Sequence, residues 1–223
     1  MKWLIAGLLM LSAANTALAE TSLSADVAVG VYSKYLWRGY DLGGDADYLV
    51  QPEVTFGLAG VSLGVWGNYN EATEKLDEVD VSFEYAHDFG ELISARLGHI
   101  SYAVKDGADT AEVYVGASLA LPVDIALDLN YDYDEAEAWF ASLGLSKGFR
   151  LSEQLGLNAS VAFGCQDFDY LNQGEVGAGL DYSVLERLTF SPAVLYSFPL
   201  SRNAEDAGVE DAFVASLTVA YSF

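Results

Sequence analysis

Cysteine is almost absent from this sequence of 223 residues, in which Cys165 is the single example. One thiol cannot form an intramolecular disulfide, which excludes a small secreted scaffold held together by several bridges. The chain also has only two histidines, so a metal centre built from Cys and His ligands is not expected. We therefore predict no cofactor and interpret Cys165 as an apolar packing residue.

Positive charge is the second scarcity, because 10 Lys and Arg residues stand against 33 Asp and Glu residues, for a net charge of −23. Nothing in such a chain supplies the basic footprint that nucleic acid requires, so nucleic acid is excluded as a partner. Acidic chains that are poor in aromatics tend to be disordered, but here aromatics make up 13% and hydrophobic residues 52%. No Pro- or Ser-rich linker interrupts the chain, which predicts one folded domain.

Long hydrophobic runs are missing after the N-terminus, where "WLIAGLLML" follows Lys2. Small residues come next, and Ala17 and Ala19 occupy the two positions of an A-x-A cleavage site. This pattern predicts a secretory signal peptide at residues 1–19, cleaved after Ala19, and a mature domain at residues 20–223. Downstream of it, no apolar stretch reaches the length of a membrane-spanning helix.

What the mature chain does contain is alternation with a period of two. In "VDIALDLNYDYD", which starts at Val123, apolar and aromatic residues occupy the odd positions and polar residues most of the even ones. The segments 79–85 and 176–184 alternate in the same way. This period is typical of β-strands whose two faces meet different surroundings.

The alternating segments are about as long as tilted strands that cross a membrane, which need roughly ten residues. We predict twelve of them, at residues 25–40, 48–58, 61–70, 78–88, 92–103, 110–121, 123–134, 136–149, 154–168, 174–185, 187–198 and 210–223. An even number of strands fits a bacterial single-chain barrel. The predicted fold class is therefore all-β: a transmembrane, antiparallel, up-and-down β-barrel of about twelve strands.

The connections between these segments differ on the two sides of the predicted barrel. Short turns such as "FGE" after Asp88 alternate with longer, acidic loops such as residues 41–47. Outer-membrane barrels have short periplasmic turns and longer external loops, which predicts that both termini are periplasmic and that the protein lies in the bacterial outer membrane. The last segment ends on Phe223 and should close against the first strand. We expect it also to engage the barrel-assembly machinery, with outer-membrane lipid as the other partner.

Successive side chains of a strand point to opposite faces of the sheet, so each predicted strand has an outward set facing lipid and an inward set facing the lumen. The outward set should form two aromatic belts at the membrane interfaces. Its members near the external ends are Tyr35, Trp37, Tyr69, Tyr133, Trp139 and Phe198, and those near the periplasmic ends are Phe56, Phe149, Tyr182, Tyr221 and Phe223.

The inward set is charged and small. Its predicted pore-lining members are Lys34, Arg38, Glu53, Asp80, Glu84, Arg96, Glu112, Asp124, Asp128, Asp132, Glu175 and Asp181. Barrels of roughly eight strands are filled by their side chains and those of roughly sixteen contain a channel, so twelve predicts a narrow aqueous lumen. A bore filled by its own charged side chains is the alternative. Acids that line a pore favour cations, unless they merely solvate the lumen or pair with the basic residues.

The segment "SKYLWRGY" combines two of the scarce cations with aromatic residues. As part of a strand it would place Tyr35 and Trp37 toward lipid and Lys34 and Arg38 toward the lumen. With a regular hairpin loop at residues 41–47, Lys34 should lie opposite Glu53.

This region also resembles a known family. "VGVYSKYLWRGYDLGGD", followed by "QPEVTFGL" and "SLGVWGN", is similar to the opening of the TorF-type putative porins, whose Ser-x-Tyr-x-x-Arg-Gly segment corresponds to Ser33, Tyr35, Arg38 and Gly39. The resemblance implies an outer-membrane barrel with an expected pore function and no known substrate.

A lipid-acting enzyme is one alternative function. The pair His99 and Ser101 is similar to the His-x-Ser spacing of outer-membrane phospholipase A, and both side chains would face lipid. The neighbouring strand offers only Ala111, Val113 and Val115 on that face, none of which could orient the imidazole. We therefore expect no catalytic activity.

A structural or adhesive barrel is the other alternative, but the loops are of ordinary length, without the long insertions typical of adhesive barrels. The preferred function is a porin-like channel for passive diffusion of small solutes, with a weak cation preference.

Overall fold

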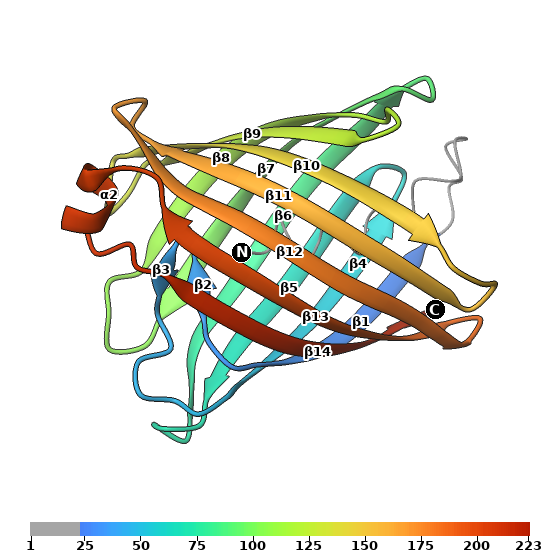
Figure 1. The fold of residues 1–223 in the computed structure, drawn as a ribbon, viewed down its shortest axis with the longest axis horizontal. Coiled ribbons are helices and arrows are strands. Elements are labelled where there is room, and N and C mark those ends of the chain that lie inside the picture. Colours follow the sequence, from blue (N-terminus) through green and yellow to red (C-terminus); the bar gives the residue numbers. More distant parts are fainter. Residues whose placement is uncertain (1–22) are drawn as a thin grey trace.

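The computed structural model describes residues 23–223, and the predicted signal peptide lies outside the described residues. Twelve antiparallel strands form one closed barrel in the order β1-β14-β13-β12-β11-β10-β9-β8-β7-β6-β5-β4 (Figure 1). The predicted fold class is confirmed. Among residues 23–223, no helix has both the length and the apolarity needed to cross a membrane.

Each barrel strand pairs with its sequence neighbour, as in an up-and-down meander. The strands are β1 (Ser24–Tyr32), β4 (Leu49–Leu58), β5 (Val61–Asn70), β6 (Lys75–Phe89), β7 (Ile93–Val104), β8 (Thr110–Leu119), β9 (Asp124–Asp132), β10 (Trp139–Arg150), β11 (Leu155–Gln166), β12 (Tyr170–Leu185), β13 (Leu188–Pro199) and β14 (Ala212–Ser222). A short helix, α2 (Arg202–Asp206), lies in the connection before β14, and its first turn is capped by the Ser201 hydroxyl, which accepts from the Ala204 N–H at 3.2 Å.

The barrel closes where β1 pairs with β14. The register runs from Asp26 opposite Ser222 to Tyr32 opposite Ser216, and the Phe223 N–H donates to the Ala25 carbonyl at 2.9 Å. The other edge of β1 pairs with β4, so the sheet has no free edge strand. The start of β1 and the C-terminus lie at the end of the barrel with the short turns (the turn end), and α2 lies at the opposite end (the loop end; Figure 1).

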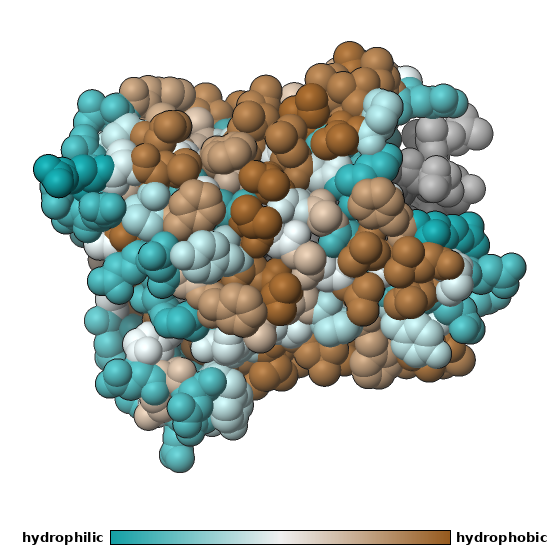
Figure 2. Space-filling view, in the orientation of Figure 1, coloured by the Kyte–Doolittle hydropathy of each residue, from teal (hydrophilic) through white to brown (hydrophobic). Residues whose placement is uncertain are grey.

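The two faces of the barrel wall have opposite character. On β8, Val113 and Val115 are 44% and 55% exposed, whereas Glu112 and Tyr114 between and beside them are 1% and 6% exposed. Figure 2 shows the same contrast as a broad apolar surface over the strands with hydrophilic residues at the two ends. Soluble proteins place charge outside and apolar groups inside, so this reversal indicates that lipid surrounds the wall.

The first strand is shorter than the sequence predicts. The prediction of one strand over residues 25–40 is wrong, because β1 ends at Tyr32 and the chain then folds back into a two-stranded hairpin, β2 (Leu36–Trp37) and β3 (Tyr40–Asp41). Arg38 and Gly39 form its two-residue turn with φ values of 50° and 86°. Two successive positive φ values are the signature of a tight hairpin turn, which glycine favours at the second position.

The seam between β1 and β14 provides a test of the register. Ala28 lies directly opposite Ala220, within the Cα separation that a disulfide bridges. In a Cys165→Ser background, Ala28→Cys with Ala220→Cys should form an intramolecular disulfide under mild oxidation, measured as a mobility shift that dithiothreitol reverses.

The matched control pairs Ala28→Cys with Ala126→Cys, since Ala126 lies on β9, several strands away around the barrel. Efficient bridging in the control, or none across the seam, would contradict the register.

Candidate functional site

Residues 33–48 fold into the loop end of the barrel, and we call this segment the inner hairpin. It is braced internally: the Leu42 N–H donates to the Tyr35 carbonyl at 2.7 Å, and Lys34 forms an ion pair with Asp41. The predicted pairing of Lys34 with Glu53 is therefore wrong. Glu53 lies instead opposite Ala28 and Trp66 in the barrel ladder, because Lys34 is not part of a barrel strand.

Arg38, at the tip of the inner hairpin, binds the far wall of the barrel. Its Nη1 and Nη2 atoms donate to Oε1 and Oε2 of Glu112, each at 2.8 Å. The guanidinium carbon lies 4.4 Å from the ring centroid of Trp37 and 4.3 Å from that of Phe140. A planar guanidinium is thus held at its edge by a carboxylate and at its faces by aromatic rings, the geometry in which arginine binds most strongly.

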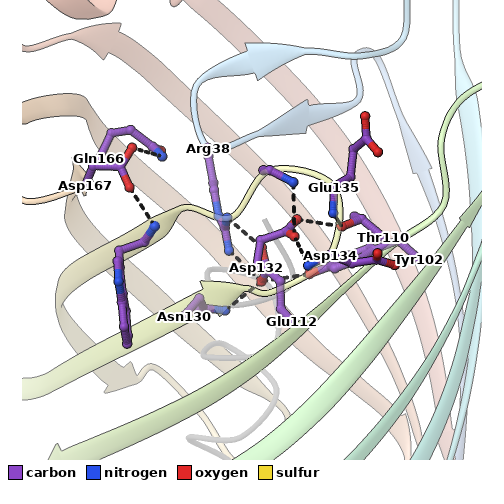
Figure 3. A network of polar contacts seen from close by, with 12 residues as sticks. Arg38, Tyr102, Thr110, Glu112, Asn130, Asp132, Asp134, Glu135, Gln166 and Asp167 are labelled. Carbon is purple, nitrogen blue, oxygen red and sulfur yellow. Dashed lines mark hydrogen bonds and ion pairs between the residues drawn. The ribbon is translucent and has the colours of Figure 1, made fainter.

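Three strands fix the carboxylate that receives Arg38. Glu112 on β8 also accepts hydrogen bonds at Oε2 from the Tyr102 hydroxyl of β7 at 3.2 Å and from Asn130 Nδ2 of β9 at 3.0 Å. Figure 3 shows these side chains converging on Glu112 below the tip of the hairpin. Glu112 therefore accepts four hydrogen bonds, two from Arg38 and one each from Tyr102 and Asn130.

A second carboxylate, Asp132, organises the connection above this cluster. Its Oδ2 accepts from the Thr110 hydroxyl at 2.7 Å, and its Oδ1 accepts from the backbone N–H groups of Asp134 and Ala136 at 3.0 and 3.2 Å (Figure 3). Asp132 therefore serves the turn after β9 and does not contact Arg38 through a hydrogen bond or ion pair that would compete with Glu112.

Other strands fasten the sides of the hairpin. Asn172 Nδ2 of β12 donates to the Arg38 carbonyl at 2.8 Å, and Asn70 Nδ2 of β5 donates to the Gly43 carbonyl at 3.1 Å. The Tyr35 hydroxyl donates to Glu78 Oε2 of β6 at 2.7 Å. Burial raises the pKa of the Tyr35 phenol, which therefore stays protonated and remains a donor.

Apolar contacts complete the packing of the hairpin. Leu36 is fully buried against Tyr32, Ala212 and Val214, while Tyr35 packs with Leu49 and Trp66 on the other side. Tyr35 is 6% exposed, so the prediction that it faces lipid is wrong, and Trp37, which packs against the same group, is likewise inside. Both errors arise because the strand alternation was continued past Tyr32.

Gly39 lies close to β12 and to the connection before β14. A Cβ atom there would lie 2.8 Å from Val209 Cγ1 and 3.0 Å from Gln173 Cβ, in addition to the strain of its positive φ. Leaving the wall between β1 and β4, the hairpin thus reaches β8, β10 and β12, and it crosses the bore near the loop end.

The structure divides the predicted pore-lining residues by depth. Asp80, Glu112, Asp128, Asp132 and Glu175 are buried, whereas Lys34, Arg38, Glu53, Glu84, Arg96, Asp124 and Asp181 are partly exposed. Arg96 and Asp128 form an ion pair at 2.6 Å, and Tyr114 donates to Glu84 at 3.1 Å. Glu112, which binds the tip of the hairpin, is among the most buried of these acids, at 1% exposed.

The remaining wall carries small side chains. Its inward positions on β10, β11 and β12 include Ser142, Gly144, Ser146, Ser160, Ala162 and Gly177. Glu175 and Asp181 are the inward acids of β12, and Asp181 accepts from Asn158 Nδ2 and from the Ser191 hydroxyl, each at 2.6 Å. Charge is therefore distributed unevenly around the interior: most charged side chains lie on β4 to β9, and most small ones on β10 to β12.

His99 makes a contact that the sequence analysis did not foresee. Its Nε2 atom lies 2.7 Å from the hydroxyl of Tyr133, in the connection that follows β9. Tyr133 is a phenol on the outer surface, so the contact joins two side chains of the aromatic belt and supplies no carboxylate to orient His99 toward Ser101.

Substitutions of Arg38 and Glu112 test whether their ion pair stabilises the barrel. Arg38→Ala should destabilise the barrel by about 3–5 kcal/mol, because it leaves the buried Glu112 carboxylate without its cation. Urea titration of the protein refolded into lipid vesicles measures the change. Adding Glu112→Gln to Arg38→Ala should recover part of the loss, since the amide carries no charge.

Lys34→Ala is the matched control, because its ion pair with Asp41 is partly exposed and should contribute less than about 1 kcal/mol. Equal losses for Lys34→Ala and Arg38→Ala would contradict the assignment of Arg38 as the anchor.

No family model matches the sequence, and no curated protein matches it in a sequence search. The TorF-type likeness thus remains a resemblance carried by residues 29–45, 51–58 and 62–68. Structural comparison, in contrast, finds porins. The NanC porin in a rhombohedral crystal form is 15% identical, with a TM-score of 0.59 over 89% of this chain and 98% of that chain. The KdgM porin is 10% identical, with a TM-score of 0.60 over 90% and 99%.

KdgM is also known in complex with a disordered oligogalacturonate, and that structure is 11% identical with a TM-score of 0.60. At such low identity the likeness concerns the backbone. The chain has the closed barrel fold of these porins.

Proposed function

We propose that this protein is a small outer-membrane porin through which small solutes diffuse passively. The observation that carries the proposal is that the wall of the closed barrel is apolar on its outer face and polar on its inner face. Charged side chains such as Asp124 and Asp181, partly exposed on the inward face, require water inside the bore. The porin neighbours, which share this fold, support a channel rather than an enzyme.

We further propose that the turn end, where the described termini meet, faces the periplasm and that the acidic loops face the outside. Barrels with short turns on one side and longer loops on the other have this orientation. It accords with the predicted signal peptide and with export to the outer membrane of a Gram-negative bacterium. Lipid would contact the apolar wall, and the barrel-assembly machinery would receive the aromatic last strand, β14. Membership of the TorF-type family belongs to the same proposal.

The inner hairpin sets the size limit in this proposal. A bore crossed at the loop end by Arg38 and Tyr35 leaves room only for small solutes, and passage depends on how the hairpin sits. Inward acids outnumber inward arginines, and Arg38 and Arg96 are each neutralised by an ion pair. The residual field is negative, which favours cations over anions.

Planar-bilayer recording of the refolded protein tests the channel. Discrete conductance steps are expected, and in a KCl gradient the reversal potential should indicate K⁺ preference. Asp124→Asn should reduce this preference, because Asp124 faces the bore from β9. Repeated insertions without any conductance step would contradict the porin proposal, and anion selectivity would contradict the charge preference.

Asp106→Asn is the matched control. Asp106 is exposed in the connection between β7 and β8, so removing its charge should leave the reversal potential closer to that of the wild type than Asp124→Asn does.

A further inference from the structure

The surroundings of the Arg38 guanidinium have the form of a binding site. We propose that Glu112, Phe140 and their supporting residues form a recognition site for solutes that carry a guanidinium group, and that the Arg38 side chain occupies this site in the absence of solute. The proposal rests on the porin function, because it names the solute class that the channel would select.

The contacts of Arg38 define which chemistry the site accepts. Both Glu112 oxygens take an N–H from the guanidinium at 2.8 Å, a pairing that is specific for a planar, two-pronged donor. The guanidinium carbon lies 4.3 Å from the centre of the Phe140 ring, which attracts a cation through its π electrons. A carboxylate or a sugar acid would instead face the charge of Glu112 and be repelled.

The site belongs to the barrel wall and not to the hairpin. Glu112 and Phe140 lie on β8 and β10, and the two side chains that donate to Glu112, Tyr102 and Asn130, lie on β7 and β9. These strands pair with one another in a continuous ladder. The carboxylate therefore stays oriented by Tyr102 and Asn130 if Arg38 leaves, and the wall retains a preformed site for a free cation.

The hairpin can leave without opening the barrel. β2 and β3 pair only with each other in the described structure, forming a two-stranded sheet apart from the barrel ladder. At its base the Ser33 N–H donates to the Ala215 carbonyl of β14, and its other polar attachments to the wall are made by side chains, chiefly those of Arg38, Tyr35 and Asn172. A solute that takes the place of Arg38 removes the strongest of these contacts, so binding of the solute and displacement of the hairpin tip are linked.

Methylguanidinium is a suitable probe, because it carries the same planar group without a backbone. Titration calorimetry of the refolded Arg38→Ala barrel in detergent, with NaCl of equal ionic strength as the reference, should show saturable binding. The wild type should bind at least about tenfold more weakly, because Arg38 already fills the site. The Arg38→Ala/Glu112→Gln barrel is the control and should lose at least about tenfold in affinity relative to Arg38→Ala, since it lacks the charged partner.

Heat-dependent gel mobility and circular dichroism would verify that each variant is folded. If Arg38→Ala does not fold, Arg38→Lys serves instead: lysine cannot make the two-pronged contact, so methylguanidinium should displace it more easily than it displaces arginine. Undetectable binding to the folded Arg38→Ala barrel, or equal affinity with and without Glu112→Gln, would overturn the site.

Conductance of the same preparations separates this inference from the porin function. Binding that depends on Glu112 in a barrel without conductance would support the site and contradict the porin. Conductance with no Glu112-dependent binding of methylguanidinium would support the porin and overturn the site.

Discussion

A β-sheet in lipid must leave no backbone group unpaired, and closure of β1 onto β14 is how this chain meets that demand. Once the sheet is closed, every strand has one face toward lipid and one toward the bore, and period-two alternation becomes obligatory. The chain can then carry many acids such as Glu112 without destabilising the fold, because their side chains face the polar interior of the barrel. The apolar wall seen in Figure 2 is the other half of the same requirement.

The inner hairpin depends on this polar interior. A buried ion pair such as Arg38 with Glu112 is stable only where further donors complete the carboxylate, and Tyr102 and Asn130 do so from adjacent strands. The wall therefore holds the Glu112 carboxylate in position for the Arg38 side chain of the hairpin. The hairpin carries Arg38 to Glu112 across the loop end of the bore, which in the proposed orientation is the end that faces the outside.

The sequence predicted the barrel well, because alternation such as that of residues 123–134 reports directly on the two faces of a strand. It failed at residues 33–40, where Lys34 and Arg38 keep one parity and Tyr35 and Trp37 the other although the chain turns back. The reversal depends on a positive φ at Arg38, a residue that rarely adopts one, and only Gly39 hinted at it. The partner of Arg38 could not be predicted, since parity gives the face of Glu112 but not what crosses the bore. Tyr133 was missed as the partner of His99 because it lies beyond the nearest strand.

The seam has a consequence for the order of folding. The hydrogen bond from the Ser222 hydroxyl to Asp26 joins residues 196 positions apart, and the whole β1–β14 ladder has comparable separations. Local hairpins such as β7–β8 can form early, but the cylinder exists only after the most distant segments meet, a step with a high entropic cost and slow kinetics. Until then both β1 and β14 present open edges able to pair with other chains, so escorting the unclosed sheet to the membrane is the stage at which this protein is most exposed to aggregation.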